Sequence, residues 1–233
     1  MNILAIDTSS SYASIAVARD DQIAAESHFG TNRTLSARLL PEINRLLELA
    51  GLAVSEIDLF GCALGPGSFT GVRAGAATIQ GLALATGAPC AGFSTLAMLA
   101  MNVPLASAPV CTLLDARKNE VYAGLYDCSG ELPVPLLDDC VISPNTLSER
   151  LAPYADRQVI CVGDGARVYR QELLALLGDR ILFAPASCTA GRAANGIMLA
   201  RHLHQTGNCV APELLLPHYI RPSEAELNKK SSA

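Results

Sequence analysis

The chain contains no tryptophan, and aromatic residues make up only 5% of its 233 residues. Charged residues are also scarce, at 17% against roughly 25% in average soluble proteins. Hydrophobic residues reach 50%, and this balance excludes disordered, collagen-like and coiled-coil proteins. Because so little charge leaves more apolar surface than one core absorbs, we expect a globular protein with a permanent partner.

Basic residues are too few for strong direct binding of nucleic acid. The 17 Lys and Arg residues are outnumbered by 22 Asp and Glu residues, the net charge is −5, and no basic cluster occurs. The eight cysteines include no pair closer than 12 residues, which excludes a zinc knuckle and a dense disulfide scaffold. We therefore predict reduced thiols, with Cys62, Cys111 and Cys161 buried in strands.

No segment has the pattern of a membrane span or a signal peptide. The longest uncharged stretch, 41 residues between Arg73 and Asp115, is interrupted by glycines and prolines. The amino terminus lacks the basic segment of a signal peptide. We expect a cytoplasmic protein with no membrane contact.

The order of predicted elements repeats once along the chain. An apolar strand ends at Asp7 and another at Asp115, and each is followed by two further strands and then a helix. This repetition predicts an α/β fold built from a duplicated mixed-sheet unit. We divide the chain into an N-terminal lobe, a C-terminal lobe and a polar tail, at residues 1–103, 104–221 and 222–233.

The segment Gly65-Pro66-Gly67-Ser68-Phe69-Thr70-Gly71-Val72-Arg73 lies between a predicted strand and a predicted helix. Its spacing matches neither a Walker phosphate loop nor a dinucleotide-binding loop. Two interpretations stay open: an anion cradle at a helix start, or a tight turn with Ser68 as the helix cap.

The glycines of the following helix indicate close packing against another helix. Each would cost about 1 kcal/mol relative to alanine unless packing offsets it. One small-residue face joins the apolar stripe of the preceding helix, which spans residues 34–50, and we predict that together they form a partner interface. The residues of this predicted interface are Leu39, Ile43, Leu46, Gly71, Gly75, Thr78 and Leu82.

Few residues are candidates for catalysis. Asp7 and Asp115 end two predicted central strands, where carboxylates either hold hydrated magnesium or simply form turns. The four histidines do not share a helix face, and no serine or cysteine has a neighbouring base at a recognisable spacing. We predict no catalytic residue and no metal site in this chain.

Three segments resemble the bacterial TsaB family, also called YeaZ. They are MNILAIDTS at residues 1–9, GPGSFTGVR at 65–73 and TLLDARKNEVY at 112–122, and residues 217–222 are similar to the family's closing segment. The resemblance implies an actin-like, sugar-kinase-like (ASKHA) fold with two related lobes.

The resemblance also implies a role in making threonylcarbamoyladenosine at position 37 of tRNA. It implies a non-catalytic scaffold that binds and activates a TsaD-type transferase, with a TsaE-type ATPase as a further partner. The tRNA would contact the complex mainly through the other subunits. The chain is expected to pair with a second copy of itself when its partner is absent.

The nucleotide site of this fold is expected to be vestigial here. The residues left from it are Asp7, Asp115, Gly163 and Gly165, and the loops after both aspartates lack glycines that let a backbone approach phosphate. The helix over residues 34–50 has no histidine, so the transferase's metal pair is missing. We expect weak or absent ATP/ADP-Mg binding and no activity of the chain alone. The alternatives are an ATP-dependent phosphotransferase or ATPase and, with less support, a peptidase.

Overall fold

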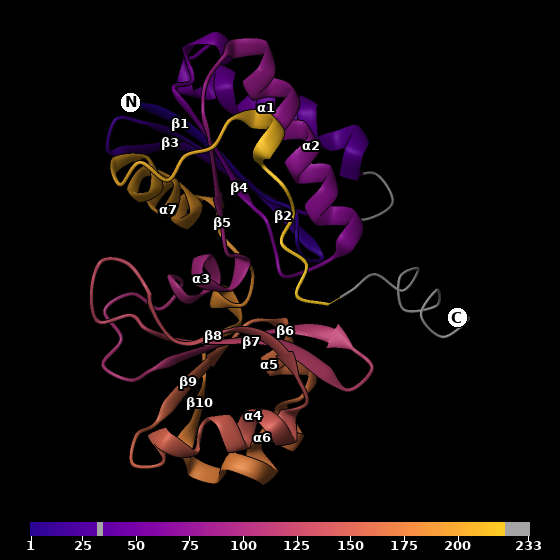
Figure 1. Cartoon of the computed structure of the whole chain (residues 1–233), viewed down its shortest axis with the longest axis vertical. Helices are drawn as coiled ribbons and strands as arrows, with labels where there is room; N and C mark the ends of the chain where they lie inside the picture. Colours follow the sequence, from indigo (N-terminus) through magenta and orange to yellow (C-terminus); the bar gives the residue numbers. More distant parts are fainter. Residues whose placement is uncertain (32–34, 222–233) are drawn as a thin grey trace.

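The computed structural model describes residues 1–31 and 35–221, so the predicted helix start at Thr34 and the predicted tail 222–233 lie outside the described residues. Two lobes lie one above the other in Figure 1, each built on a five-stranded mixed sheet. The sheet of the first lobe has the order β3-β2-β1-β4-β5. Its strands are β1 (Asn2–Asp7), β2 (Tyr12–Arg19), β3 (Gln22–Gly30), β4 (Leu59–Ala63) and β5 (Cys90–Phe93).

The sheet of the second lobe repeats this topology with the order β8-β7-β6-β9-β10. In both sheets the first three strands form an antiparallel meander, and the remaining two pair in parallel on the other side of the first strand. The predicted duplication is therefore confirmed. The strands are β6 (Val110–Arg117), β7 (Glu120–Asp127), β8 (Val134–Ile142), β9 (Val159–Val162) and β10 (Ile181–Phe183).

Two helices cover one face of the first sheet. They are α1 (Leu35–Ala50) and α2 (Phe69–Thr86), and α1 continues through Pro41. Ser68 caps α2 by accepting a hydrogen bond from the Gly71 backbone N–H at 3.3 Å, and Gly87 ends the helix with a positive φ of 77°. The interpretation of Ser68 as a helix cap is therefore confirmed.

One helix of each half packs on the sheet of the other lobe. The helix after β5, α3 (Thr95–Ala100), joins the apolar cluster of β6, β7 and β9. The last helix, α7 (Ala193–Gln205), packs on the face of the first sheet opposite α1 and α2. The chain therefore crosses between the lobes on both sides of the predicted boundary at residue 103, and α7 belongs to the first lobe's core.

The second lobe carries three shorter helices, which pack on its sheet. They are α4 (Pro144–Arg150), α5 (Asp164–Val168) and α6 (Arg170–Leu177). Five single 3₁₀ turns also occur among the described residues: η1 (Val54–Glu56), η2 (Ala152–Tyr154), η3 (Gly178–Arg180), η4 (Ala186–Cys188) and η5 (Pro212–Leu214). The sequence analysis did not predict β10 or the second half of β8.

The thiol prediction is confirmed, since all eight cysteines are free and Cys62, Cys111 and Cys161 are buried. Among the helices of residues 1–31 and 35–221, none combines the length and apolar character that crossing a membrane requires.

Candidate functional site

Asp7 ends β1 in an enclosed position. Its side chain is buried, its Oδ1 accepts a hydrogen bond from the Ser9 backbone N–H at 2.9 Å, and burial raises the pKa of its carboxyl. A Cβ on Gly191 would lie 2.6 Å from Asp7 Oδ2, so the segment before α7 closes over this carboxylate. Burial thus makes the charged form of this carboxyl less favourable than it is in water.

Asp115 stabilises the turn that follows β6. Its Oδ1 accepts hydrogen bonds from the Arg117 backbone N–H at 2.8 Å and from Tyr169 Oη at 3.2 Å. The backbone N–H of Asp115 donates to Asp164 Oδ1 at 3.0 Å, and burial raises the pKa of the Asp164 carboxyl. The two predicted strand-end aspartates thus make the bonds of turn residues. In the described part of the chain, no three His, Cys, Asp or Glu side chains gather where they could hold a metal ion.

Gly163 and Gly165 lie so close to β6 that a side chain at either position would clash with its backbone. A Cβ on Gly163 would lie 2.1 Å from the Leu113 carbonyl oxygen, and one on Gly165 would lie 2.9 Å from the carbonyl carbons of Leu113 and Leu114. Gly163 also has a positive φ of 111°. Close packing with β6 therefore accounts for both glycines without a phosphate group beside them.

The residues of the predicted interface lie within the first lobe. Leu39, Ile43 and Leu46 are buried in the core between α1 and the first sheet. A Cβ on Gly71 would lie 2.0 Å from the Thr8 carbonyl oxygen, and one on Gly75 would lie 2.4 Å from Thr8 Oγ1. These residues face their own lobe because the loop after β1 packs directly on α2.

The remaining two interface candidates also face inward in part. Thr78 is half-buried and donates a hydrogen bond from Oγ1 to the Ala74 carbonyl oxygen within α2, at 2.8 Å. Leu82 is half-buried and packs against the first lobe's core. The apolar face of α2 formed by Ala76, Ile79 and Ala83 lies in the same core, so both predicted faces of the helix pack within the chain.

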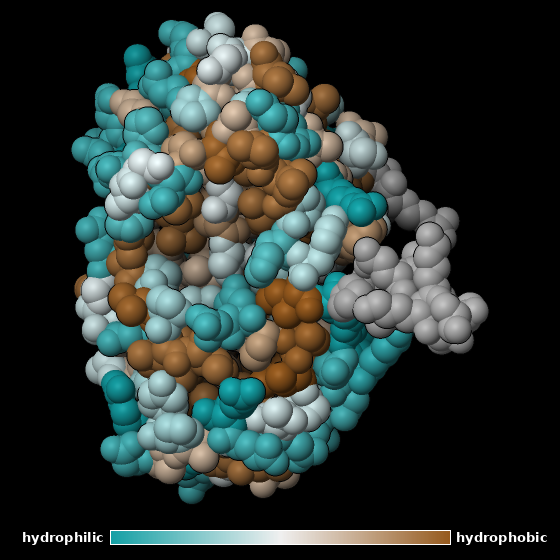
Figure 2. Space-filling model, in the orientation of Figure 1, coloured by the Kyte–Doolittle hydropathy of each residue, from teal (hydrophilic) through white to brown (hydrophobic). Residues whose placement is uncertain are grey.

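A third face of α2 is exposed, and the sequence analysis did not single it out. It carries Arg73, Ala77, Gly81 and Leu84, at helical spacing, and 64% of the Leu84 surface is accessible. Beside it runs the segment after α7, in which Leu214 and Leu216 are exposed. Figure 2 shows apolar surface where η5 and α2 lie in Figure 1.

A groove of about 500 Å³ separates α2 from this segment. Its lining is Arg73, Ala76, Ala77, Gln80, Leu216, Pro217 and Tyr219. At one end the Arg73 guanidinium lies 3.8 Å from the centre of the Phe69 ring, and its Nε donates to Tyr219 Oη at 2.7 Å. The arrangement offers an apolar groove next to one positive charge, which suits an apolar side chain near a carboxylate.

The protein-family model described as "TsaD: tRNA N6-adenosine threonylcarbamoyltransferase" matches residues 29–229 of this chain. The tRNA threonylcarbamoyladenosine biosynthesis protein TsaB of Bacillus subtilis is 30% identical over 226 residues, which cover 97% of this chain and 96% of that protein. The protein of the same name from Escherichia coli is 31% identical, with coverage of 97% and 96%.

Solved structures confirm the fold class. YeaZ from Pseudomonas aeruginosa matches with a TM-score of 0.81 and 31% identity, over 94% of this chain and 99% of that one. The ROK hexokinase of Thermus thermophilus matches with a TM-score of 0.51 and 13% identity, over 89% and 100%. This second likeness concerns the fold alone, and it agrees with the predicted sugar-kinase-like architecture.

Proposed function

The chain belongs to the TsaB family of tRNA threonylcarbamoyladenosine biosynthesis proteins, and from this premise we propose that it is a non-catalytic subunit that binds and activates a TsaD-type transferase. Its match to the TsaD family model also means that chain and partner share one ancestral fold. The observation that carries the proposal is the exposed apolar surface of α2 and η5, while the candidate catalytic groups Asp7 and Asp115 are engaged in internal contacts.

The contacts of Asp7 and Asp115 support a non-catalytic role. Asp7 is enclosed and its pKa is raised, while Asp115 accepts the hydrogen bonds of its own turn. A phosphotransferase needs carboxylates that hold magnesium and glycine loops that approach phosphate. Here the backbone of β6 occupies the space next to Gly163 and Gly165. These contacts favour the scaffold over ATP-dependent phosphoryl transfer.

We place the transferase on the exposed face of α2, together with η5. Large exposed leucines such as Leu84, Leu214 and Leu216 are costly on a free surface, and a partner that covers them gains their burial. Ala77 and Gly81 are small, so a partner helix can approach the α2 backbone closely there. The Arg73 guanidinium at the end of the groove favours an acidic residue of the transferase nearby.

Replacement of one exposed leucine tests this placement. Leu84→Glu should weaken binding of the purified transferase about 30-fold or more, as measured by titration calorimetry, because a buried anchor at an interface contributes ~2 kcal/mol. Leu174→Glu is the matched control, since Leu174 is an exposed leucine on α6 of the second lobe. Equal binding by both variants and the wild type would move the interface elsewhere.

The net charge of the chain and the exposed surface of α2 and η5 also suggest how the further partners bind. With a net charge of −5, this chain repels tRNA, so we expect the transferase to hold the substrate and the TsaE-type ATPase to join the assembled complex. Without the transferase, two copies of the chain should pair through α2 and η5. Light scattering should show a dimer that Leu84→Glu converts to a monomer, and a dimer that persists in this variant would place self-pairing on another face.

A further inference from the structure

The segment after α7 connects the two lobes at their outer edge. Its first part belongs to the first lobe, since Leu215 is buried in that lobe's core and its carbonyl oxygen accepts a hydrogen bond from Gln80 of α2. The His218 backbone N–H donates to the Leu64 carbonyl oxygen at 2.8 Å. Figure 1 shows the segment running along α2 and then down to the level of β6.

Tyr219 fixes the middle of the segment on the start of α2. Its ring stacks on Phe69 with 4.9 Å between ring centres, and its hydroxyl accepts the hydrogen bond from Arg73 Nε. Because Tyr219 also lines the groove beside α2, this contact connects the groove with the end of the segment that reaches the second lobe.

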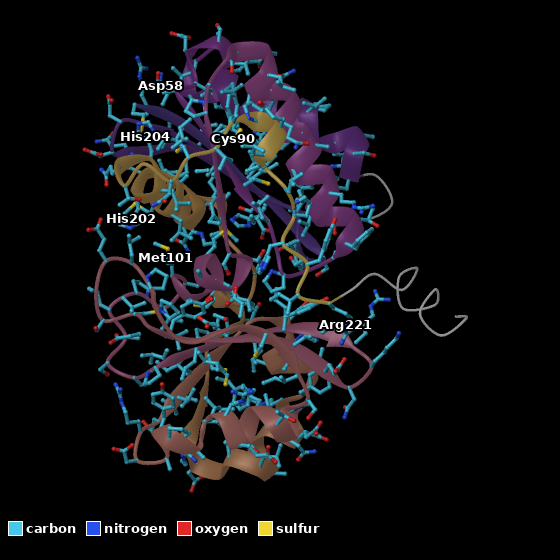
Figure 3. The ribbon with its side chains drawn as sticks, in the orientation of Figure 1. Asp58, Cys90, Met101, His202, His204 and Arg221 are labelled. Carbon is cyan, nitrogen blue, oxygen red and sulfur yellow. The ribbon has the colours of Figure 1, made fainter. Side chains whose placement is uncertain are left out.

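Arg221 makes the contact with the second lobe. Its Nη1 donates to the Ala116 carbonyl oxygen at 2.7 Å, and its Nη2 forms an ion pair with Glu120. These two partners flank the turn between β6 and β7, in which residues 117–119 all have positive φ although none is glycine. Figure 3 shows Arg221 between the lobes. Through its contacts with Ala116 and Glu120, this one side chain holds both ends of a strained turn.

The lobes are also connected by a second tie, the set of hydrogen bonds at Asp139. Asp139 on β8 accepts hydrogen bonds from Tyr126 of β7 and from Ser94, which is held in the first lobe by its neighbours. The Phe93 carbonyl oxygen accepts from the Leu64 N–H, and the Thr95 N–H donates to the Gly65 carbonyl oxygen. Tyr126 is buried in this tie, whereas 19% of the Arg221 side chain and 38% of the Glu120 side chain are accessible. Water and salt ions reach the Arg221–Glu120 pair more easily and weaken it, so the tie through Arg221 is the easier one to break.

We propose that residues 217–221 form a releasable strap between the lobes. The end at His218 and Tyr219 stays on the first lobe, while the Arg221 end detaches from the β6–β7 turn and lets the lobes move apart around the tie at Asp139. The strap thereby gives the chain a closed and an open arrangement. The contact of Arg221 at the protein surface determines which of the two the chain adopts.

Distances between the lobes test the strap in the full chain. Spin labels are attached through noncanonical amino acids at Glu48 on α1 and Glu149 on α4, which are both exposed. Arg221→Gln should increase the population at a longer distance about fivefold, which corresponds to ~1 kcal/mol for one exposed ion pair. Wild-type protein in about 1 M salt should show the same longer population, because the screening length there is ~3 Å.

Arg201→Gln is the matched control. Arg201 also pairs with a carboxylate, Asp21, and also donates to a backbone carbonyl, that of Asp20, but all three residues lie within the first lobe. Its loss should leave the interlobe distance unchanged. Glu120→Gln should reproduce the effect of Arg221→Gln from the other side of the pair. A single unchanged distance in both strap variants, with or without salt, would overturn the proposal.

Discussion

Gly75 and Gly81 lie on the same helix but in opposite surroundings, and their replacement by alanine should have opposite effects on stability. A Cβ on Gly75 would lie 2.4 Å from Thr8 Oγ1, whereas no heavy atom lies within 4 Å of the corresponding position at Gly81. Thr8 cannot turn away freely, because its Oγ1 donates a buried hydrogen bond to the Gly71 carbonyl oxygen at 2.7 Å.

The magnitudes decide the sign at each position. Alanine gains about 1 kcal/mol over glycine in a helix, so Gly81→Ala should raise the free energy of unfolding by about that amount. At Gly75 the same gain is opposed by overpacking, which costs ~1–3 kcal/mol, and by loss of the Thr8 hydrogen bond, which costs ~1–3 kcal/mol. Gly75→Ala should therefore lower the free energy of unfolding by about 1–5 kcal/mol.

Urea unfolding followed by circular dichroism measures both variants. The Thr8→Ala background supplies the control, because removal of Oγ1 should make Gly75→Ala nearly harmless there, with a coupling energy of about 2 kcal/mol. Equal stability of Gly75→Ala and Gly81→Ala in the wild-type background would refute the reasoning. It would mean that the glycine face of α2 does not pack on the loop after β1.

Two further predictions concern acid stability and thiol reactivity. Desolvation raises the pKa of Glu26, but hydrogen bonds from His28, Arg192 and the Ala194 N–H outweigh it and lower the pKa to about 2. The charged Glu26 carboxylate therefore stabilises the folded protein fully above about pH 4.5, and this stabilisation is lost as the pH falls toward 2. Glu26→Gln should remove about 1–2 kcal/mol of the pH dependence of the free energy of unfolding in acid. An unchanged dependence of stability on pH would contradict the assignment. Cys62 and Cys161 should resist alkylation in the native protein while half-buried Cys209 reacts. Both are buried in strands, and burial also raises the pKa of the Cys62 thiol. Mass spectrometry that shows equally fast labelling of all three would contradict the strand placement.

The sequence was sufficient to predict which residues share a helix face, but it did not determine what each face packs against. The spacing of Leu39, Ile43 and Leu46 identified an apolar stripe, and only the structure shows that this stripe covers the first sheet. On α2, Gly71 and Gly75 predict close packing against another helix, whereas the group that approaches them is the loop after β1. Periodicity cannot distinguish an internal neighbour from an external one, because both require the same residue types.

The duplication could be predicted from element order, whereas the course of the chain between lobes could not. The predicted strands that end at Asp7 and Asp115 mark equivalent points of two sheets, and the topology agrees. The position of α7 depends on contacts with β1, β2 and β4, which lie far from it in the sequence and leave no local pattern. The strap was missed for the same reason, since Arg221 pairs with Glu120 across the lobes.

We expect the chain to act by binding the transferase and not through chemistry at Asp7 or Asp115. Formation of threonylcarbamoyladenosine on tRNA is measured with the purified transferase and ATPase, and with this chain as wild type, Asp7→Asn or Leu84→Glu. Asn keeps the oxygen that accepts the Ser9 N–H, so Asp7→Asn should fold and support the wild-type rate. Leu84→Glu should abolish the stimulation. Loss of modification with Asp7→Asn while the complex stays intact would contradict the account.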